Sequence, residues 1–133
     1  MLEGRDWYQM AGASAQTIDD LRSAAPDELP PSYLHLLSVS NGGEGPLPVS
    51  PFNLCLDPGE EVTARLANDQ GRLDGFMIFG SNGGGEYLAF DTRRGAPWSV
   101  VTIDMVAGPS SAEVVAKDFD TFIELIGVET SDA

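Results

Sequence analysis

Residues 29–45 are Leu-Pro-Pro-Ser-Tyr-Leu-His-Leu-Leu-Ser-Val-Ser-Asn-Gly-Gly-Glu-Gly, and they encode one short helix together with its start and its stop. Pro30 and Pro31 suit the first turn, where a backbone N–H has no partner inside the helix. Apolar side chains at helical spacing predict a buried stripe of Tyr33, Leu36, Leu37 and Val39. Asn41-Gly42-Gly43 then ends the helix, because Asn and Gly tolerate the left-handed backbone that closes it.

A mainly antiparallel sheet is predicted from the centre of the chain. Residues 76–79 are apolar throughout, as in a central strand that is covered on both faces. The Gly-rich residues 80–85 allow a tight hairpin turn into a second strand over 86–91. A further strand over 98–104 follows, with Val100 or Val101 and Ile103 facing inward. Strands that follow one another through short turns predict a meander of about four to six strands.

The segment between the first helix and this sheet predicts one more strand and one more helix. Prolines at positions 46, 48 and 51 favour an extended loop or a sheet edge. Residues 52–56 alternate as in a strand, with Phe52, Leu54 and Leu56 on the buried face. Residues 60–69 form an amphipathic helix that buries Val62, Leu66 and Ala67, and Asn68-Asp69-Gln70-Gly71 ends it.

The N-terminal and C-terminal segments each leave an alternative open. Residues 1–14 contain Trp7 and Tyr8 and form either a loose, flexible arm or an aromatic flap over the core. Thr17 is the expected cap of a helix over 18–24 that follows. Near the other end, Ser110 with Glu113 offers a capping box. The preferred alternative keeps 113–116 extended, because adjacent β-branched residues disfavour a helix, and lets Asp118 cap a helix over 119–126. Residues 129–133 are expected to fray.

Three stretches together resemble the SMI1/KNR4 (SUKH) superfamily. The first is Leu29-Pro30, Tyr33, Leu36-Leu37 and Asn41-Gly42-Gly43, since in that family a helix led by Leu-Pro and an aromatic residue runs into Asn-Gly-Gly. The second is a Gly-rich turn with an acid and a strand ending in Asp, here Gly85, Glu86 and Asp91. The third is the closing helix. The resemblance extends from about Thr17 to Ile126, and the proline-marked 46–51 loop and Trp7-Tyr8 depart from the family pattern.

Composition favours one α+β domain over residues 1–133. Leu, Ile, Val and Phe make up about a quarter of the 133 residues, above the roughly 20% below which disorder prevails. Gly and Pro together make up about 18%, against roughly 12% on average, which favours a fold with many turns over a helical bundle. We therefore expect a single domain in which N-terminal helices and a C-terminal helix pack on the sheet.

The charge of the chain points to a basic partner. There are 21 acidic and 7 basic residues, and the net charge is −14 at pH 7. Such a field repels nucleic acids and anionic membranes and speeds association with a basic protein, although acidity also serves solubility alone. The sequence has neither a run of about 20 apolar residues nor the cationic start of a signal peptide. We expect a soluble, cytoplasmic protein, as a monomer or a homodimer.

No pattern in the sequence is typical of a catalytic, nucleotide or metal site. The Gly-rich residues 80–85 lack the Gly-Lys-Ser/Thr of a phosphate loop and precede a strand, not a helix. His35 has no Cys or carboxylate at metal-ligand spacing, and the single Cys55 excludes an internal disulfide. A nucleophile elbow and a calcium loop are both absent. We therefore expect no cofactor, no metal and no enzyme activity.

The resemblance implies a non-catalytic interaction protein. Bacterial members of the superfamily are largely immunity proteins, which bind and neutralise a cognate toxin, and many such toxins act on nucleic acids and carry basic surfaces. Two alternatives stay open: a regulatory scaffold of the same fold with a non-toxin client, and a small hydrolase or ligand-binding protein with a cleft beside the Gly-rich hairpin.

The predicted partner-binding surface joins the turn at 41–44 to the hairpin Gly83-Gly84-Gly85-Glu86. Its candidate residues are Tyr33, Asn41, Gly42, Gly43, Glu44, Gly85, Glu86 and Asp91. Each has a structural alternative, with Tyr33 as a core residue and the glycines as turn formers.

Overall fold

The computed structural model describes residues 1–68, 73 and 75–129, and within them the strands form one antiparallel sheet in sequential order. The strands are β1 (Tyr8–Gln9), β2 (Gly43–Pro46), β3 (Asn53–Leu56), β4 (Phe76–Ser81), β5 (Glu86–Asp91), β6 (Val100–Asp104) and β7 (Glu113–Ala116). The predicted α+β meander is therefore confirmed, although the described residues contain seven strands and exceed the expected number.

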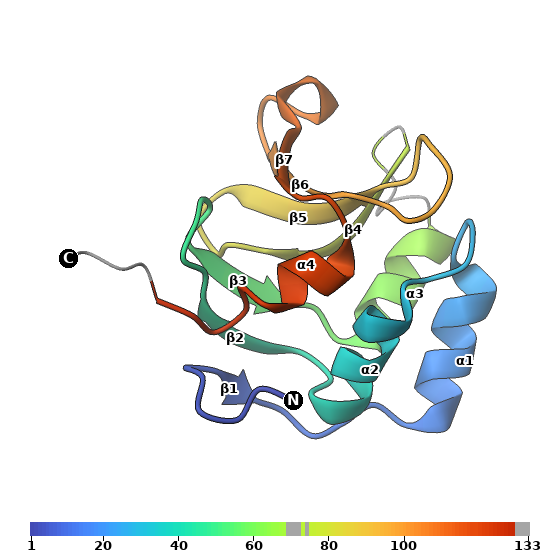
Figure 1. Ribbon diagram of the computed structural model, residues 1–133. Helices are drawn as coiled ribbons and strands as arrows, with labels where there is room; N and C mark the ends of the chain where they lie inside the picture. Colours follow the sequence, from blue (N-terminus) through green and yellow to red (C-terminus); the bar gives the residue numbers. More distant parts are fainter. Residues whose placement is uncertain (69–72, 74, 130–133) are drawn as a thin grey trace.

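The helices gather on one face of this sheet. They are α1 (Ala15–Ala24), α2 (Pro31–Val39), α3 (Gly59–Ala67) and α4 (Phe119–Ile123), and the short 3-10 helix η1 (Pro109–Ser111) precedes β7. Figure 1 shows α1, α2 and α3 grouped together, with α4 beside α2 over the sheet. No described helix has the length and apolar character that crossing a membrane requires.

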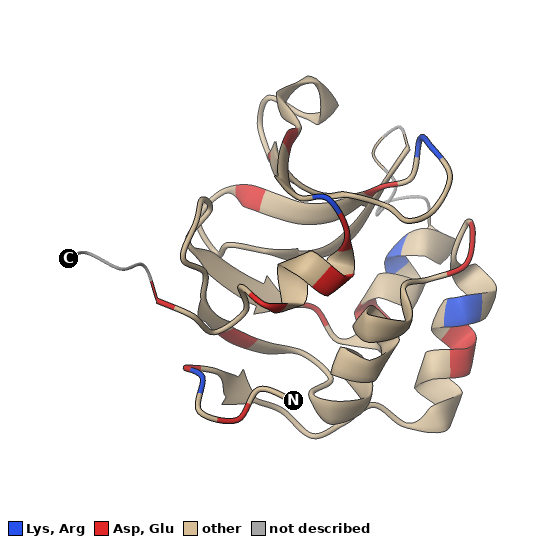
Figure 2. Cartoon of the chain, viewed as in Figure 1, with Lys and Arg blue, Asp and Glu red and all other residues tan. Residues whose placement is uncertain are grey.

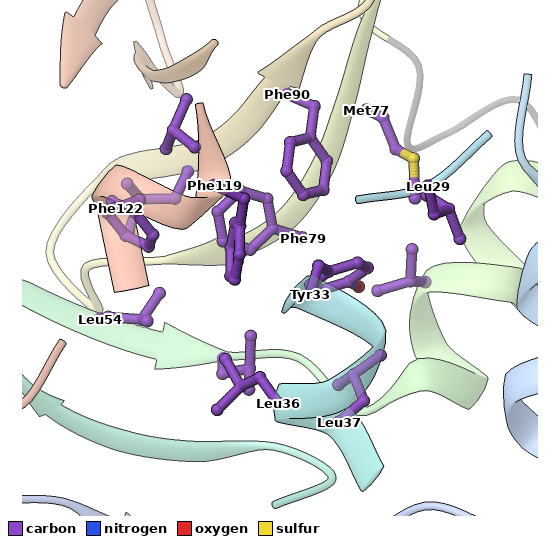
Figure 3. Packing of buried hydrophobic residues seen from close by; sticks show 14 of the residues in the cluster. Leu29, Tyr33, Leu36, Leu37, Leu54, Met77, Phe79, Phe90, Phe119 and Phe122 are labelled. Atoms are coloured by element: carbon purple, nitrogen blue, oxygen red, sulfur yellow. The ribbon is translucent and has the colours of Figure 1, made fainter. Parts of the chain in front are cut away.

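The main core lies between α2, α4 and the centre of the sheet, and aromatic rings fill it (Figure 3). The ring centroid of Tyr33 lies 5.2 Å from that of Phe90 and 5.4 Å from that of Phe119, both in edge-on arrangements. The ring centroids of Phe79 and Phe90, on neighbouring strands, are 4.6 Å apart. Aromatic pairs at these separations add stability beyond the area they bury.

The opposite face of the sheet holds a second, smaller cluster. Its buried members are Phe76, Ile78, Ala89, Val101 and Ile103. Residues 76–79 of β4 thus contribute alternately to the two clusters, and the prediction of a strand buried on both faces is confirmed.

Residues 1–14 form the flap, the second of the two arrangements that the sequence left open. Leu2 is buried in the main core, and β1 pairs with β2. The Arg5 guanidinium donates to the carbonyl oxygens of Ile123 and Ile126, at 2.6 and 3.1 Å, so the flap also holds the end of α4. Because these contacts join opposite ends of the sequence, the flap belongs to the folded body.

The C-terminal segment adopts the preferred arrangement. Residues Glu113–Ala116 are extended as β7, and α4 follows with Asp118 as its cap. The Asp118 Oδ1 accepts a 2.7 Å hydrogen bond from the backbone N–H of Thr121. The helix itself ends at Ile123, earlier than expected, and turns lead on to Gly127, whose φ is +76°.

Local predictions failed at several positions. Ser14, not Thr17, caps α1, since the Ser14 Oγ accepts from the N–H of Thr17 at 3.1 Å. Phe52 is 56% exposed, because its φ of 69° turns the side chain away before β3 begins. In α2 Leu34 is buried although it was not expected in the buried stripe, and Val39 is only partly buried. The helix contacts both α1 and α4, so it buries a wider face than a single stripe. In α3 Ala67 is exposed at the last turn.

Three further predictions concern chain ends and turns. Gly43 and Glu44 lie in β2 and not in a turn, so the predicted turn is confined to the residues before them. The expected stop of the second amphipathic helix falls partly outside the described residues, of which Asn68 is its final member. The expected fraying of residues 129–133 concerns a segment of which only Glu129 is described.

Candidate functional site

Five residues form a row across the face of the sheet opposite the helices. Tyr8 pairs with Glu44, Glu44 with Cys55, Cys55 with Ser81, and Ser81 with Tyr87. Residues paired across neighbouring strands share a face, and Cys55 alternates with Leu54 and Leu56 of the main core. We call Tyr8, Glu44, Cys55, Ser81 and Tyr87 the open-face row.

Asn53 connects this row to the Gly-rich hairpin turn. Its Nδ2 donates to the Oε2 of Glu44 and to the backbone carbonyl oxygen of Asn82, both at 3.2 Å. The two stretches that the sequence singled out, around residue 44 and over 83–86, are therefore brought together through one side chain of β3.

The hairpin turn is organised by Asn82. Its Oδ1 accepts from the N–H groups of Gly84 and Glu86, at 2.8 and 3.0 Å, and its Nδ2 lies 3.4 Å from the Oε1 of Glu86. Gly83 and Gly85 have φ values of +75° and +107°, a region that other residues rarely adopt. The predicted hairpin is confirmed, and its glycines serve the backbone.

The electrostatics of the row favour binding over nucleophilic chemistry. Burial raises the pKa of the Cys55 thiol, and the nearby Glu44 carboxylate raises this pKa further. A thiol with a raised pKa stays protonated at neutral pH and is a weak nucleophile. Neither Glu44 nor Glu86 is ion-paired with a described residue: the acids that are paired are Glu3, Asp57, Glu61 and Asp91. Figure 2 shows acidic positions spread over strands, helices and loops.

Tyr33 has a core position. Its side chain has no exposed surface, and burial raises the pKa of its phenol well above the ordinary value. Of the two expectations for Tyr33, the one that makes it a core residue therefore describes its place in the fold. Its ring is not part of any surface.

The Asn41 side chain links the end of α2 to the start of α3. The Oδ1 of Asn41 accepts from the N–H of Gly59 at 2.8 Å, and its Nδ2 donates to the Oε1 of Glu60 at 2.7 Å. This amide caps the first turn of α3, which has no capping side chain of its own. The φ of Gly42 is +103°, so a left-handed residue does follow the helix as predicted.

Gly43 and Gly45 make room for the Trp7 indole. A Cβ at either glycine would lie 2.7 Å from a carbon of that ring, closer than real contacts allow. The Nε1 of Trp7 donates to the Ser40 Oγ at 3.1 Å, which fixes the indole over the strand. The alternating glycines of this stretch are thus explained by close approach as well as by turn geometry.

Asp91 lies apart from the row and its hairpin. The Arg93 guanidinium binds it in a bidentate manner, with Nε 2.9 Å from Oδ1 and Nη2 2.8 Å from Oδ2. These hydrogen bonds from Arg93 hold the pKa of Asp91 below its usual value. Glu86 and Asp91 are the two ends of β5, so about 17 Å of extended backbone separates them.

Sequence reasoning missed Tyr8, Asn53 and Asn82. Asn82 had a usable signal, because an Asn before a Gly-rich run is typical of a turn closed by its own side chain. Tyr8 and Asn53 had none, since their positions depend on which strands pair. Among the described residues no three His, Cys, Asp or Glu side chains are grouped to hold a metal ion, and His35 is exposed.

The comparisons with known proteins agree with this fold. A search of curated proteins finds no match to the sequence. The model of the SMI1 / KNR4 family (SUKH-1) matches residues 12–125, from the end of the flap to the turn after α4. That match covers most of the chain and includes α2, the hairpin and the closing helix, so this protein belongs to the SMI1/KNR4 family (SUKH-1), a family of the immunity-protein type.

Proposed function

We propose that this protein is a non-catalytic immunity protein, which neutralises a basic toxin by binding it. The observation that carries the proposal is membership of a family of the immunity-protein type, and a net charge of −14 supports it. The negative electrostatic field of such a charge accelerates the approach of a cationic partner and repels nucleic acids and anionic membranes. The expected location of the protein is the cytoplasm.

The open-face row and the Asn82 hairpin are the proposed contact surface. Glu44 and Glu86 supply carboxylates that no described cation neutralises, and hydrogen bonds from Asn53 and Asn82 restrain them. Tyr8, which is 73% exposed, adds an aromatic ring at the edge of the row. Restrained carboxylates next to an exposed aromatic residue suit an interface with a basic protein, because little side-chain freedom is lost on binding.

The same features make enzyme activity a poorer explanation. The Glu86 carboxylate accepts a hydrogen bond from the Asn82 amide, the Cys55 thiol is protonated, and His35 lies on a different element, α2. These groups therefore do not form the pair of nucleophile and base that covalent catalysis needs.

Co-expression with the product of the neighbouring reading frame tests the proposal. We expect that product to be a basic, growth-inhibiting protein, and we expect this chain to restore growth and to bind it with an affinity that falls as salt is raised. A neighbouring product that is not toxic, or whose toxicity this chain leaves unchanged, would contradict the immunity function.

The contact surface has its own test. We expect Glu44→Gln combined with Glu86→Gln to weaken binding about tenfold, measured by calorimetry. Glu113→Gln on β7 is the matched control and is expected to change the affinity less than about twofold. Equal effects of the double variant and the control would remove the row and the hairpin from the interface while leaving the function intact.

A further inference from the structure

A groove on the helix-bearing side of the molecule is separate from the open-face row. It has a volume of about 430 Å³ and lies between the start of α2, the segment before β6 and the start of α4. Its apolar lining includes Leu29, Pro30, Pro31, Pro97, Trp98 and Phe119. Three carboxylates also line it, Glu28, Asp118 and Asp120. A volume of this size is within the range of pockets that hold small groups.

The groove is built from rigid parts. Proline rings restrict the backbone on two of its sides, and the side chains of Trp98 and Phe119 are almost fully buried and so cannot easily move. Asp118 is held by its hydrogen bond to Thr121 as the cap of α4. A pocket that exists before binding costs little to organise when a guest enters.

The charged side chains that line the groove are acidic. Glu28 and Asp120 are exposed, and neither they nor Asp118 form an ion pair with a described residue. Hydrogen bonds from Thr121, and to a smaller extent the adjacent Lys117 cation, keep the pKa of Asp118 below the ordinary value. The groove therefore combines an apolar lining with three carboxylate side chains.

We infer that this groove receives an arginine side chain of the basic partner protein. The inference rests on the proposed function, because it assigns a contact to the same partner. Arginine fits better than lysine, since its planar guanidinium is weakly hydrated and binds carboxylates with paired hydrogen bonds. A second copy of this chain is a poorer guest, because two molecules of charge −14 repel each other.

A peptide titration tests the groove without the partner. The probe is acetyl-Gly-Arg-Gly-amide, added to the ¹⁵N-labelled full chain, and the matched probes replace Arg by Lys or by the uncharged isostere citrulline. We expect the Arg peptide to shift the Trp98 indole and the amides of Phe119 and Asp120, with saturation in the millimolar range. The Lys peptide should bind more weakly, and the citrulline peptide should cause no saturable shift.

Charge variants provide the second arm. We expect Glu28→Gln combined with Asp120→Asn to weaken the Arg peptide about tenfold, while Glu113→Gln leaves its affinity unchanged. Asp118 is kept, because its removal would also uncap α4. Absence of groove shifts, equal shifts from the citrulline peptide, or equal affinity in both variants would overturn the inference. Toxin binding that persists in the double variant at full strength would do so too, without contradicting the proposed function.

Discussion

The indole Nε1 of Trp7 donates a 3.1 Å hydrogen bond to the hydroxyl oxygen of Ser40, at the end of α2. The same oxygen accepts from the N–H of Met10 at 3.0 Å, and the hydroxyl donates to the carbonyl oxygen of Gly42 at 2.6 Å. One buried hydroxyl therefore joins the flap, the end of α2 and the entry to β2.

Ser40→Ala is expected to lower the free energy of unfolding by about 2–3 kcal/mol. The change removes all three hydrogen bonds and leaves the buried carbonyl oxygen of Gly42 and the partly buried indole N–H of Trp7 without this partner, which costs more than the loss of exposed hydrogen bonds. Urea denaturation measures the difference, and faster hydrogen exchange at Met10 should accompany it. Ser38→Ala on the exposed side of the same helix is the control, with an expected change within about 0.5 kcal/mol.

Gly45→Ala should destabilise the fold by about 1–3 kcal/mol, because the new methyl group would meet both the Trp7 ring and the carbonyl oxygen of Asp6, at 2.7 and 2.5 Å. Gly95→Ala is the matched control, since a Cβ there has no atom within 4 Å. Chemical denaturation compares the two. Equal stability of both variants would show that the indole does not lie against β2 in solution.

Tyr33→Phe is expected to retain the stability of the parent or to exceed it slightly. The buried phenol oxygen has no hydrogen-bond partner among the described residues, so its removal leaves no group unsatisfied. Tyr33→Ala should instead cost about 3–5 kcal/mol, because it opens a cavity among the aromatic rings. Thermal and urea unfolding distinguish these outcomes, and a large loss in the Phe variant would point to a role for the hydroxyl.

The Asp118 cap should make stability depend on pH. Hydrogen bonding from Thr121 holds the pKa of this carboxyl below its ordinary value of about 3.9, so the ionised cap stabilises the fold above that pH. The contribution is lost as the pH falls through the lower pKa of the folded state. The stability difference between the parent and Asp118→Ala should therefore be largest near neutral pH and shrink in acid.

Asp118→Asn is the control for the pH dependence of the stability difference between the parent and Asp118→Ala. Asn also caps helices but does not titrate, so the difference between the Asn and Ala variants should not depend on pH. Urea denaturation between pH 7 and about pH 3 measures both differences. A parent-to-Ala difference that stays constant over this range would show that the carboxylate is not the stabilising group.

Local sequence patterns were sufficient to predict the elements whose start, stop or turn residues lie within the element itself. Helix α2 has prolines at its start and glycine after its end, β4 is an unbroken apolar run, and the β4–β5 turn has the required glycines. In these segments the residues that determine the conformation are neighbours in sequence, so propensity and tertiary packing agree.

Strands β1 and β2 had no such signals. Gly-Glu-Gly-Pro has little tendency to form a strand, and it becomes one because β3 pairs with it on one side and β1 on the other. The Trp7 ring then covers its glycines. The pairing of β1 with β2 and the contacts of Trp7 join residues more than thirty positions apart, and a pattern within a short window does not contain them.

The candidate site shows the same division. The amino-acid sequence alone established the net charge, the two Gly-containing stretches and the absence of a catalytic motif, because these depend on composition and on adjacent residues. Only the tertiary structure decided that Asn53 joins Glu44 to the hairpin and that Tyr33 is buried. Strand register and helix packing place distant residues together, and they are determined by the whole core rather than by any single segment.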